Sequence, residues 1–124
     1  MNKKKLISEL ESEYDAEIDG NFVTLKVAID KKRKQLVFLN LQDDFIVISS
    51  PFAAISEIDV ETAMGVRQDA LIFCGICVIG NQFFAATTTI PMDSLSAEGL
   101  NASIELVSNN ADTLEDLISN KDRF

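Results

Sequence analysis

The chain has 124 residues, of which 47% are hydrophobic and 25% are charged, a balance typical of a folded globular protein. Its formal charge of −9 argues against nucleic acid as a partner, because that binding needs lysine and arginine side chains to displace condensed counterions. No apolar run approaches the ~20 residues that span a bilayer, and glutamates follow the basic N-terminus where an export signal needs apolar residues. We therefore expect one cytoplasmic domain over residues 1–124, without membrane contact.

An amphipathic helix is predicted over residues 3–15. Leu6, Ile7, Leu10 and Tyr14 recur at three- and four-residue steps, which places them on one face. Lysines at the start of this segment and acidic side chains at its end oppose the helix dipole. We therefore expect the helix to form mainly because its apolar stripe docks on the rest of the protein.

Three strands are predicted next. Residues 23–29 alternate apolar and polar side chains, as in a strand with one buried face. Residues 36–41 are apolar on both faces at all but one position, which places this strand inside the sheet. The basic stretch 30–34 between them predicts a hairpin tip. Residues 45–48 form the third strand, and Pro51 is expected to end it because proline cannot donate to the ladder.

The segment 52–65 is ambiguous. Ser56 or Asp59 is suited to cap a short helix, and Gly65 is suited to its exit. Val60 and other β-branched residues lower the helix propensity of the segment. The sequence leaves its helical state open.

Strands at residues 71–79 and 82–90 are predicted to form an apolar hairpin. The Gly-Asn pair between them favours a two-residue loop with a primed turn. That register places Cys77 opposite Phe84.

The last element is predicted to be a helix over residues 97–119, with Ser96 as its N-cap. Its apolar residues step by four and three positions and form one continuous stripe. They are Leu100, Ile104, Val107, Ala111, Leu114 and Ile118. The predicted order α-β-β-β-α-β-β-α indicates an α+β fold, an antiparallel sheet with helices packed mainly on one face.

Cys74 and Cys77 have the Cys-x-x-Cys spacing of thiol redox and metal sites. Redox pairs of this spacing lie at a helix N-terminus, whereas this pair lies in a predicted strand, where residues three apart point to opposite faces. Their Cα atoms would be ~10 Å apart, beyond the ~7 Å limit of a disulfide. Zinc would need further ligands, and the chain has no histidine and no other cysteine. We interpret the thiols as buried apolar side chains, with a redox or metal role as the remote alternative.

No catalytic residue, cofactor or metal site is predicted. Carboxylates gather at residues 43–44, 57–61 and 115–116, but these lie in predicted turns or on helix exteriors, where no pocket raises a pKa for acid–base chemistry. The basic tip 30–34 is interpreted as a solvated turn, with anion binding as the less favoured alternative. We expect the protein not to be an enzyme.

A candidate contact surface follows the third predicted strand. Phe52, Ile55 and Ile58 form an apolar group there, with Phe52 expected at the surface rim. An open apolar patch of this kind marks a site of contact with another protein. The alternative, given equal weight, is that Phe52 and Ile55 close the core beneath the connecting helix.

The element order, size and acidity resemble the type III secretion chaperone-like fold, including its YbjN-like bacterial relatives. The proline turn and final helix of that group are similar to Thr89-Ile-Pro-Met-Asp-Ser-Leu-Ser-Ala-Glu-Gly-Leu, running into Ala111-Asp-Thr-Leu-Glu-Asp-Leu. The uncharacterised YjfI-like bacterial family resembles the chain at Phe45-Ile-Val-Ile-Ser-Ser-Pro-Phe-Ala-Ala-Ile-Ser-Glu-Ile-Asp. Secretion chaperones dimerise and bind an extended effector segment along hydrophobic grooves and sheet edges.

The resemblance therefore implies a homodimer that binds a segment of a partner protein without catalysis. It offers no catalytic or cofactor-binding residues to carry over. The alternative is an uncharacterised bacterial regulatory or stress protein that uses the same fold without handling clients.

Overall fold

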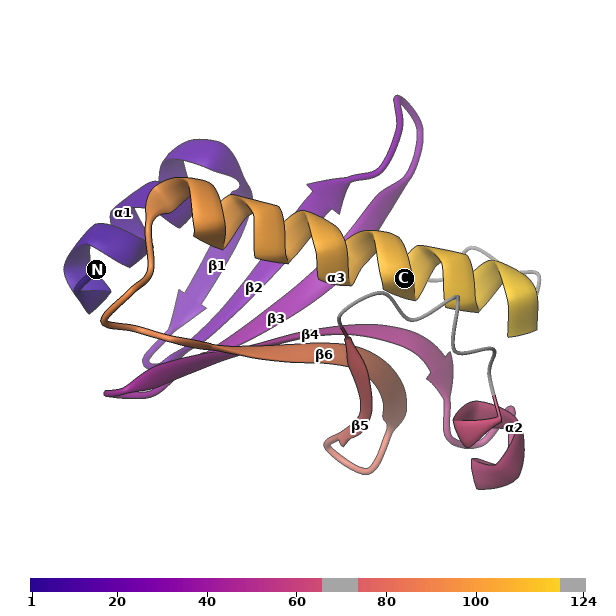
Figure 1. The fold of residues 1–124 in the computed structure, drawn as a ribbon. Helices are drawn as coiled ribbons and strands as arrows, with labels where there is room; N and C mark the ends of the chain where they lie inside the picture. The colour runs from indigo at the N-terminus through magenta and orange to yellow at the C-terminus, as the bar shows by residue number, and fades with distance from the viewer. Residues whose placement is uncertain (66–73, 119–124) are drawn as a thin grey trace.

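The computed structural model describes residues 1–65 and 74–118, which form three helices and six strands (Figure 1). The helices are α1 (Lys3–Glu13), α2 (Val60–Met64) and α3 (Ala97–Ile118). The strands are β1 (Asp15–Asp19), β2 (Phe22–Ala28), β3 (Lys34–Leu41), β4 (Phe45–Ala54), β5 (Gly75–Ile79) and β6 (Phe83–Pro91). They form one antiparallel sheet in the order β1-β2-β3-β4-β6-β5, and α1 and α3 lie across the same face of it. The predicted α+β class is confirmed.

The core lies between the sheet and the two long helices. The predicted apolar stripe of α3 has no exposed area from Leu100 to Leu114, and Ile118 packs against its edge. Ser96 caps this helix as predicted, since its Oγ accepts the Gly99 N–H at 3.0 Å. Residue 119, the predicted end of the helix, lies outside the described residues. The long stripe explains how one helix covers most of the sheet.

The strand β1 is absent from the predicted order. Its acidic residues Asp15, Glu17 and Asp19 alternate with two apolar ones, and it pairs with β2 at the edge of the sheet. The first helix ends two residues earlier than predicted, because Tyr14 is already extended with φ −135° and ψ 161°. An edge strand tolerates an acidic row, and such a row discourages pairing with another sheet.

The prediction that Pro51 ends its strand was wrong, because β4 continues through it to Ala54. Pro51 lies beyond the last β3–β4 pair, Phe38–Ser49, and beside a bulge in the β4–β6 ladder. These are the positions in a sheet where a missing N–H is tolerated. The Pro51 carbonyl is satisfied by a side chain, since Gln35 Nε2 donates to it at 2.8 Å.

The segment 52–65 is part strand and part helix. Phe52 belongs to β4, has no exposed area and stacks on Phe84 with ring centroids 6.5 Å apart. The expected position of Phe52 at the surface rim was therefore wrong, because the strand continues and turns this side chain into the core. The short helix α2 begins after Asp59, whose carboxylate accepts the Thr62 N–H at 2.7 Å. That bond holds the pKa of Asp59 below its ordinary value.

The turn of the β5–β6 hairpin has the predicted primed geometry. Gly80 and Asn81 have φ values of 54° and 55°, and the Ile79 carbonyl accepts the Gln82 N–H at 2.9 Å. Gln82 itself stays outside the ladder, because its carbonyl accepts the N–H of Ile55 at 2.9 Å. The loop therefore has one residue more than predicted.

This extra residue shifts the register of the hairpin by one. Cys77 lies opposite Ala85, so the predicted pairing with Phe84 was wrong. Because of this shift, each side chain of β5 lies on the opposite face of the sheet from the face that the predicted register gives it. Residues 71–73, the start of the first predicted strand, lie outside the described residues.

Candidate functional site

One face of the sheet carries neither of the long helices (Figure 1). We call it the open face and define it by the side chains that alternate with the buried ones along the strands. Cross-strand pairing arranges them in two rows, Asp19–Phe22–Asn40–Val47–Thr89 and Glu17–Thr24–Phe38–Ser49–Thr87. Phe22 is 60% exposed. Phe22, Phe38 and Val47 are the apolar members of these rows, and they lie among asparagine, serine and threonine side chains.

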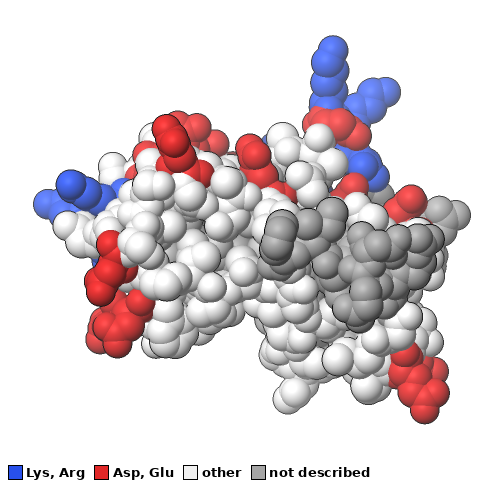
Figure 2. Space-filling view, in the orientation of Figure 1, with Lys and Arg blue, Asp and Glu red and all other residues white. Residues whose placement is uncertain are grey.

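The open face contains a groove of about 450 Å³ between β2 and β5. Figure 2 shows the surface indented below β4 and β6, beside the β5–β6 hairpin, and free of charged side chains there. The volume lies within the range of about 300–1,000 Å³ that ligand pockets occupy. The groove is lined by Phe22, Phe38, Leu39, Asn40, Val47, Ser49, Cys77, Val78, Ile79, Thr87 and Thr89.

Three polar side chains on the floor of the groove, Ser49, Cys77 and Thr87, bond to one another. The Thr87 hydroxyl donates to the Ile48 carbonyl at 3.1 Å, so the hydrogen in its 3.0 Å contact with Ser49 Oγ comes from Ser49. The Cys77 thiol in turn donates weakly to Ser49 Oγ at 3.9 Å. These hydrogen bonds end on a backbone carbonyl and leave the floor with little need for a polar ligand. An apolar occupant therefore fits the groove best.

Carboxylates border the groove on the β1 side. Register places Asp19 directly opposite Phe22, and Glu17 directly opposite Thr24, on the open face. We call Glu17 and Asp19 the acidic rim. Asp15, the third acid of β1, instead lies opposite Lys26. The strands from β4 to β5 carry no charged residue, so the groove is charged along one side only.

The two cysteines lie on different sides of the sheet. Cys74 packs against the hydrophobic core, and burial raises the pKa of its thiol. Cys77 lines the groove on the open face. Both are free and partly buried. Within residues 1–65 and 74–118, no group of three or more cysteine, aspartate or glutamate side chains is arranged to hold a metal ion.

The predicted contact residues do not line the groove. Phe52 lies in the core, while Ile55 and Ile58 are partly buried and pack against it. The alternative expectation, in which Phe52 and Ile55 close the core, is the arrangement found. Contact of Ile55 or Ile58 with a partner stays a prediction.

Two aspartate side chains hold the basic tip between β2 and β3 in place through hydrogen bonds and ion pairs. The Asp30 carboxylate accepts the N–H groups of Lys32 and Arg33 at 2.8 and 2.9 Å, and these bonds lower its pKa. The Arg33 guanidinium also donates to Asp112 of α3 at 2.9 Å. The tip is thus held against the helix as well as solvated, which leaves less of its charge for an anionic ligand.

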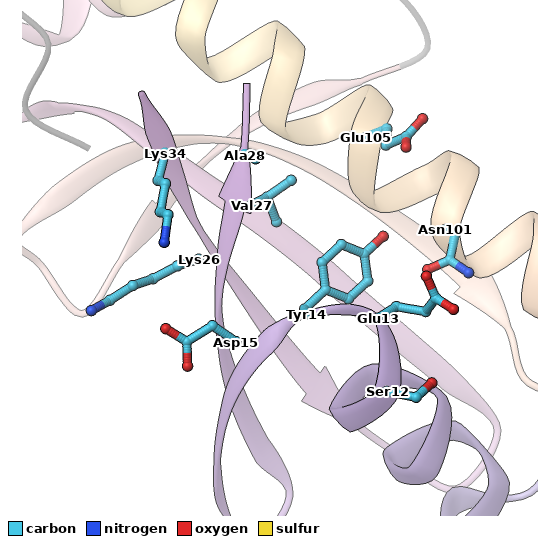
Figure 3. A pocket seen from close by; sticks show the side chains of 10 residues that line it. All are labelled: Ser12, Glu13, Tyr14, Asp15, Lys26, Val27, Ala28, Lys34, Asn101 and Glu105. Atoms are coloured by element: carbon cyan, nitrogen blue, oxygen red, sulfur yellow. The ribbon is translucent and has the colours of Figure 1, made fainter. Parts of the chain in front are cut away.

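A second cavity of about 520 Å³ lies where the end of α1 meets β2 and α3. Figure 3 shows Tyr14 reaching from the end of α1 toward Asn101 and Glu105 of α3. Burial, and then the charges of Glu105, Glu13 and Glu9, raise the pKa of Tyr14 to about 12. The phenol therefore keeps its proton at neutral pH, where it cannot act as a base.

The aromatic residues of the open face are the functional candidates that the sequence predictions missed. The signal was present in residues 36–41, which are apolar on both faces although both long helices cover the same side. A strand of this kind inside a sheet with one covered face must leave apolar side chains on the other.

Comparison of the chain with models of known protein families, and with curated proteins, found no match. Among the described helices, none combines the length and apolar character needed to cross a membrane.

Proposed function

We propose that the protein is a non-enzymatic, cytoplasmic interaction domain that binds an apolar segment of another polypeptide on the open face. The observation that carries this proposal is the uncharged groove between β2 and β5, beside an exposed aromatic side chain at Phe22. Grooves and edges of sheets recur as sites where extended or helical peptide segments dock.

The energetics favour an apolar segment. Phe22 is 60% exposed, so covering its remaining surface contributes roughly 1 kcal/mol. The Ser49 and Thr87 hydroxyls on the floor already have partners, so a ligand gains little by offering hydrogen bonds to them. Apolar contact is therefore the main source of affinity on this surface.

The resemblance to secretion chaperones supports the same proposal, because those proteins bind client segments along hydrophobic grooves. The homodimer that it implies stays a prediction. In the alternative function, a bacterial regulatory or stress protein, the open face would hold one folded partner. The remote thiol-redox or metal alternative needs Cys74 and Cys77 together, whereas they lie on opposite sides of the sheet.

Site-specific photo-crosslinking tests the proposal. A photoreactive amino acid replaces Phe22 in the groove or, as the matched control, Leu117 on α3, which is 58% exposed. We expect a stoichiometric protein adduct from position 22 and none of the same mass from position 117. Adducts through a short peptide segment support client binding, and adducts through one folded protein support the regulatory alternative. Equal adducts at both positions, or none at 22, would contradict an open-face site.

A further inference from the structure

We infer that the segment bound in the groove carries lysine or arginine beside its apolar residues. This inference rests on the proposed function and names the chemistry of the partner. It is carried by the acidic rim, which lies in the same cross-strand rows as the groove.

The rim is close enough to meet the flank of a bound segment. Neighbouring strands lie about 4.8 Å apart, so a ligand above Phe22 lies within one or two strand widths of the Asp19 carboxylate. One strand width is shorter than the Debye length of about 8 Å at physiological ionic strength, whereas two strand widths slightly exceed it, so the attraction is strongest for a ligand cation within one strand of the rim.

The acids of the rim are available to a ligand. Glu17 and Asp19 are exposed, and no ion pair within the described part of the chain includes either of them. Their neighbours opposite on β2 are the uncharged Thr24 and Phe22. Lys26 shares this face of β2 but lies directly opposite Asp15, so a lysine or arginine on the ligand would add a countercharge directly beside Glu17 and Asp19.

The charge asymmetry gives the ligand a preferred placement. Residues 75–79 of β5 carry no charged side chain, so the far side of the groove offers nothing to a cation. Basic residues should therefore lie on the β1 side of the bound segment and apolar residues over β4 and β6. An acidic flank would be repelled by the rim and by a net charge of −9.

A second copy of the chain fits this surface less well. The uncharged region spans four strands about 4.8 Å apart and about five residues at ~3.4 Å each, which is roughly 300 Å². A standard interface buries about 800 Å² on each partner. A larger contact between copies would bring both acidic rims into it, where the open face of the described strands offers Lys26 and Lys34 against Asp15, Glu17 and Asp19 of each copy. A single strand or short helix of another protein matches the area and the charge.

Two synthetic peptides test the inference against the full-length protein. They share one apolar core with alternating valine and threonine, and one has lysines at its ends while the other has glutamates. By fluorescence anisotropy at low salt, we expect the lysine peptide to bind at least about tenfold more tightly, and high salt to reduce this ratio.

Matched variants locate the effect. Glu17→Gln combined with Asp19→Asn removes the rim, and Glu11→Gln combined with Asp116→Asn makes the same chemical change on the exposed surfaces of α1 and α3. The first pair should weaken lysine-peptide binding by roughly two- to tenfold, and the second should leave it unchanged. Alkylation of Cys77 reports occupancy of the groove, with Cys74 as the internal reference on the other side.

The outcomes separate the two proposals. If both peptides protect Cys77 equally and the rim variant binds normally, the inference is overturned while the open-face site stands. If neither peptide binds or protects Cys77, the proposed function fails and the inference with it. If the protein alone sediments as a dimer that Phe22→Ser dissociates, a second copy covers the face, which also overturns the inference.

Discussion

Gln35 holds the carbonyl of Pro51 with a 2.8 Å hydrogen bond, at the point where the backbone ladder between β3 and β4 has ended. The same Nε2 donates to Ser50 Oγ at 3.0 Å, and that hydroxyl donates to the Leu36 carbonyl. Gln35 has no exposed area. Side chains therefore support β4 past the proline, where it continues to Ala54.

Gln35→Ala should destabilise the protein by roughly 2–4 kcal/mol, because it opens a cavity and leaves the Pro51 carbonyl without its donor. Gln35→Met should stay within about 1 kcal/mol of the wild type. It loses the same bond and, like alanine, removes the buried Oε1, which has no hydrogen-bond partner in the described structure, but it fills the space that alanine leaves empty. Urea unfolding measures both variants. A methionine variant as unstable as the alanine one would show that the hydrogen bonds, and not packing, dominate at this position.

Truncation of side chains buried between the helices and the sheet should lower the free energy of unfolding far more than truncation of an exposed side chain on α3. Ile104→Ala and Leu10→Ala remove fully buried side chains and should each lower the free energy of unfolding by about 2–5 kcal/mol. Leu117→Ala, which is 58% exposed on the same helix as Ile104, should change it by no more than about 0.5 kcal/mol. Similar losses for Leu117 and Ile104 in thermal unfolding would contradict the assignment of the core.

Tyr14 gives an optical test of the packing around α1, because it is the only tyrosine and the chain has no tryptophan. Phenolate absorbance should titrate near pH 12 in the native protein and near 10 in denaturant. Since the folded state raises this pKa, its stabilising effect is present below pH 10 and is lost as the pH rises toward 12. Tyr14→Phe should remove this loss of stability. A native midpoint near 10 would place the phenol in solvent.

Cys74 should react slowly with thiol reagents in the native state, because burial against the core raises its pKa and lowers its thiolate fraction. A Cys77→Ala variant isolates its rate. We expect that rate to rise when the protein is unfolded in urea, and its pH dependence to move to lower pH. Equal native and unfolded rates would show that Cys74 is not packed as described.

Local patterns predicted the elements whose energetics are local. The apolar stripe of α3 follows from residue spacing alone. The Ser96 cap follows from a hydrogen bond to the N–H of Gly99, only three residues away. The continuation of β4 past Pro51 depends on Gln35, which is sixteen residues away, and no local rule contains that contact.

The hairpin register depends on a bond between Ile55 and Gln82, which are also distant in sequence. A local turn rule cannot foresee it, and one residue of slip changes which side chains share a face. This slip decides that Cys77, and not Cys74, lines the groove. The groove therefore depends on the pairing of strands that are distant in sequence. The apolar pattern of residues 36–41 predicts only that some apolar surface stays uncovered.

The acidic rim should make peptide binding sensitive to salt. Binding of the lysine-flanked peptide should weaken severalfold between low salt and high salt, because the ion pairs are exposed and screened. The same titration of the Glu17→Gln, Asp19→Asn variant should be nearly flat. A slope that survives in this variant would assign the attraction to other acids of the protein.

An amide chemical-shift map of the protein titrated with the lysine-flanked peptide locates the bound segment on the fold. We expect the largest changes at Phe22, Phe38, Val47 and Thr87 on the open face, while α3 from Leu100 to Leu114 stays unchanged. Changes confined to the helices, or no changes on β3, β4 and β6 at saturation, would contradict binding on the open face.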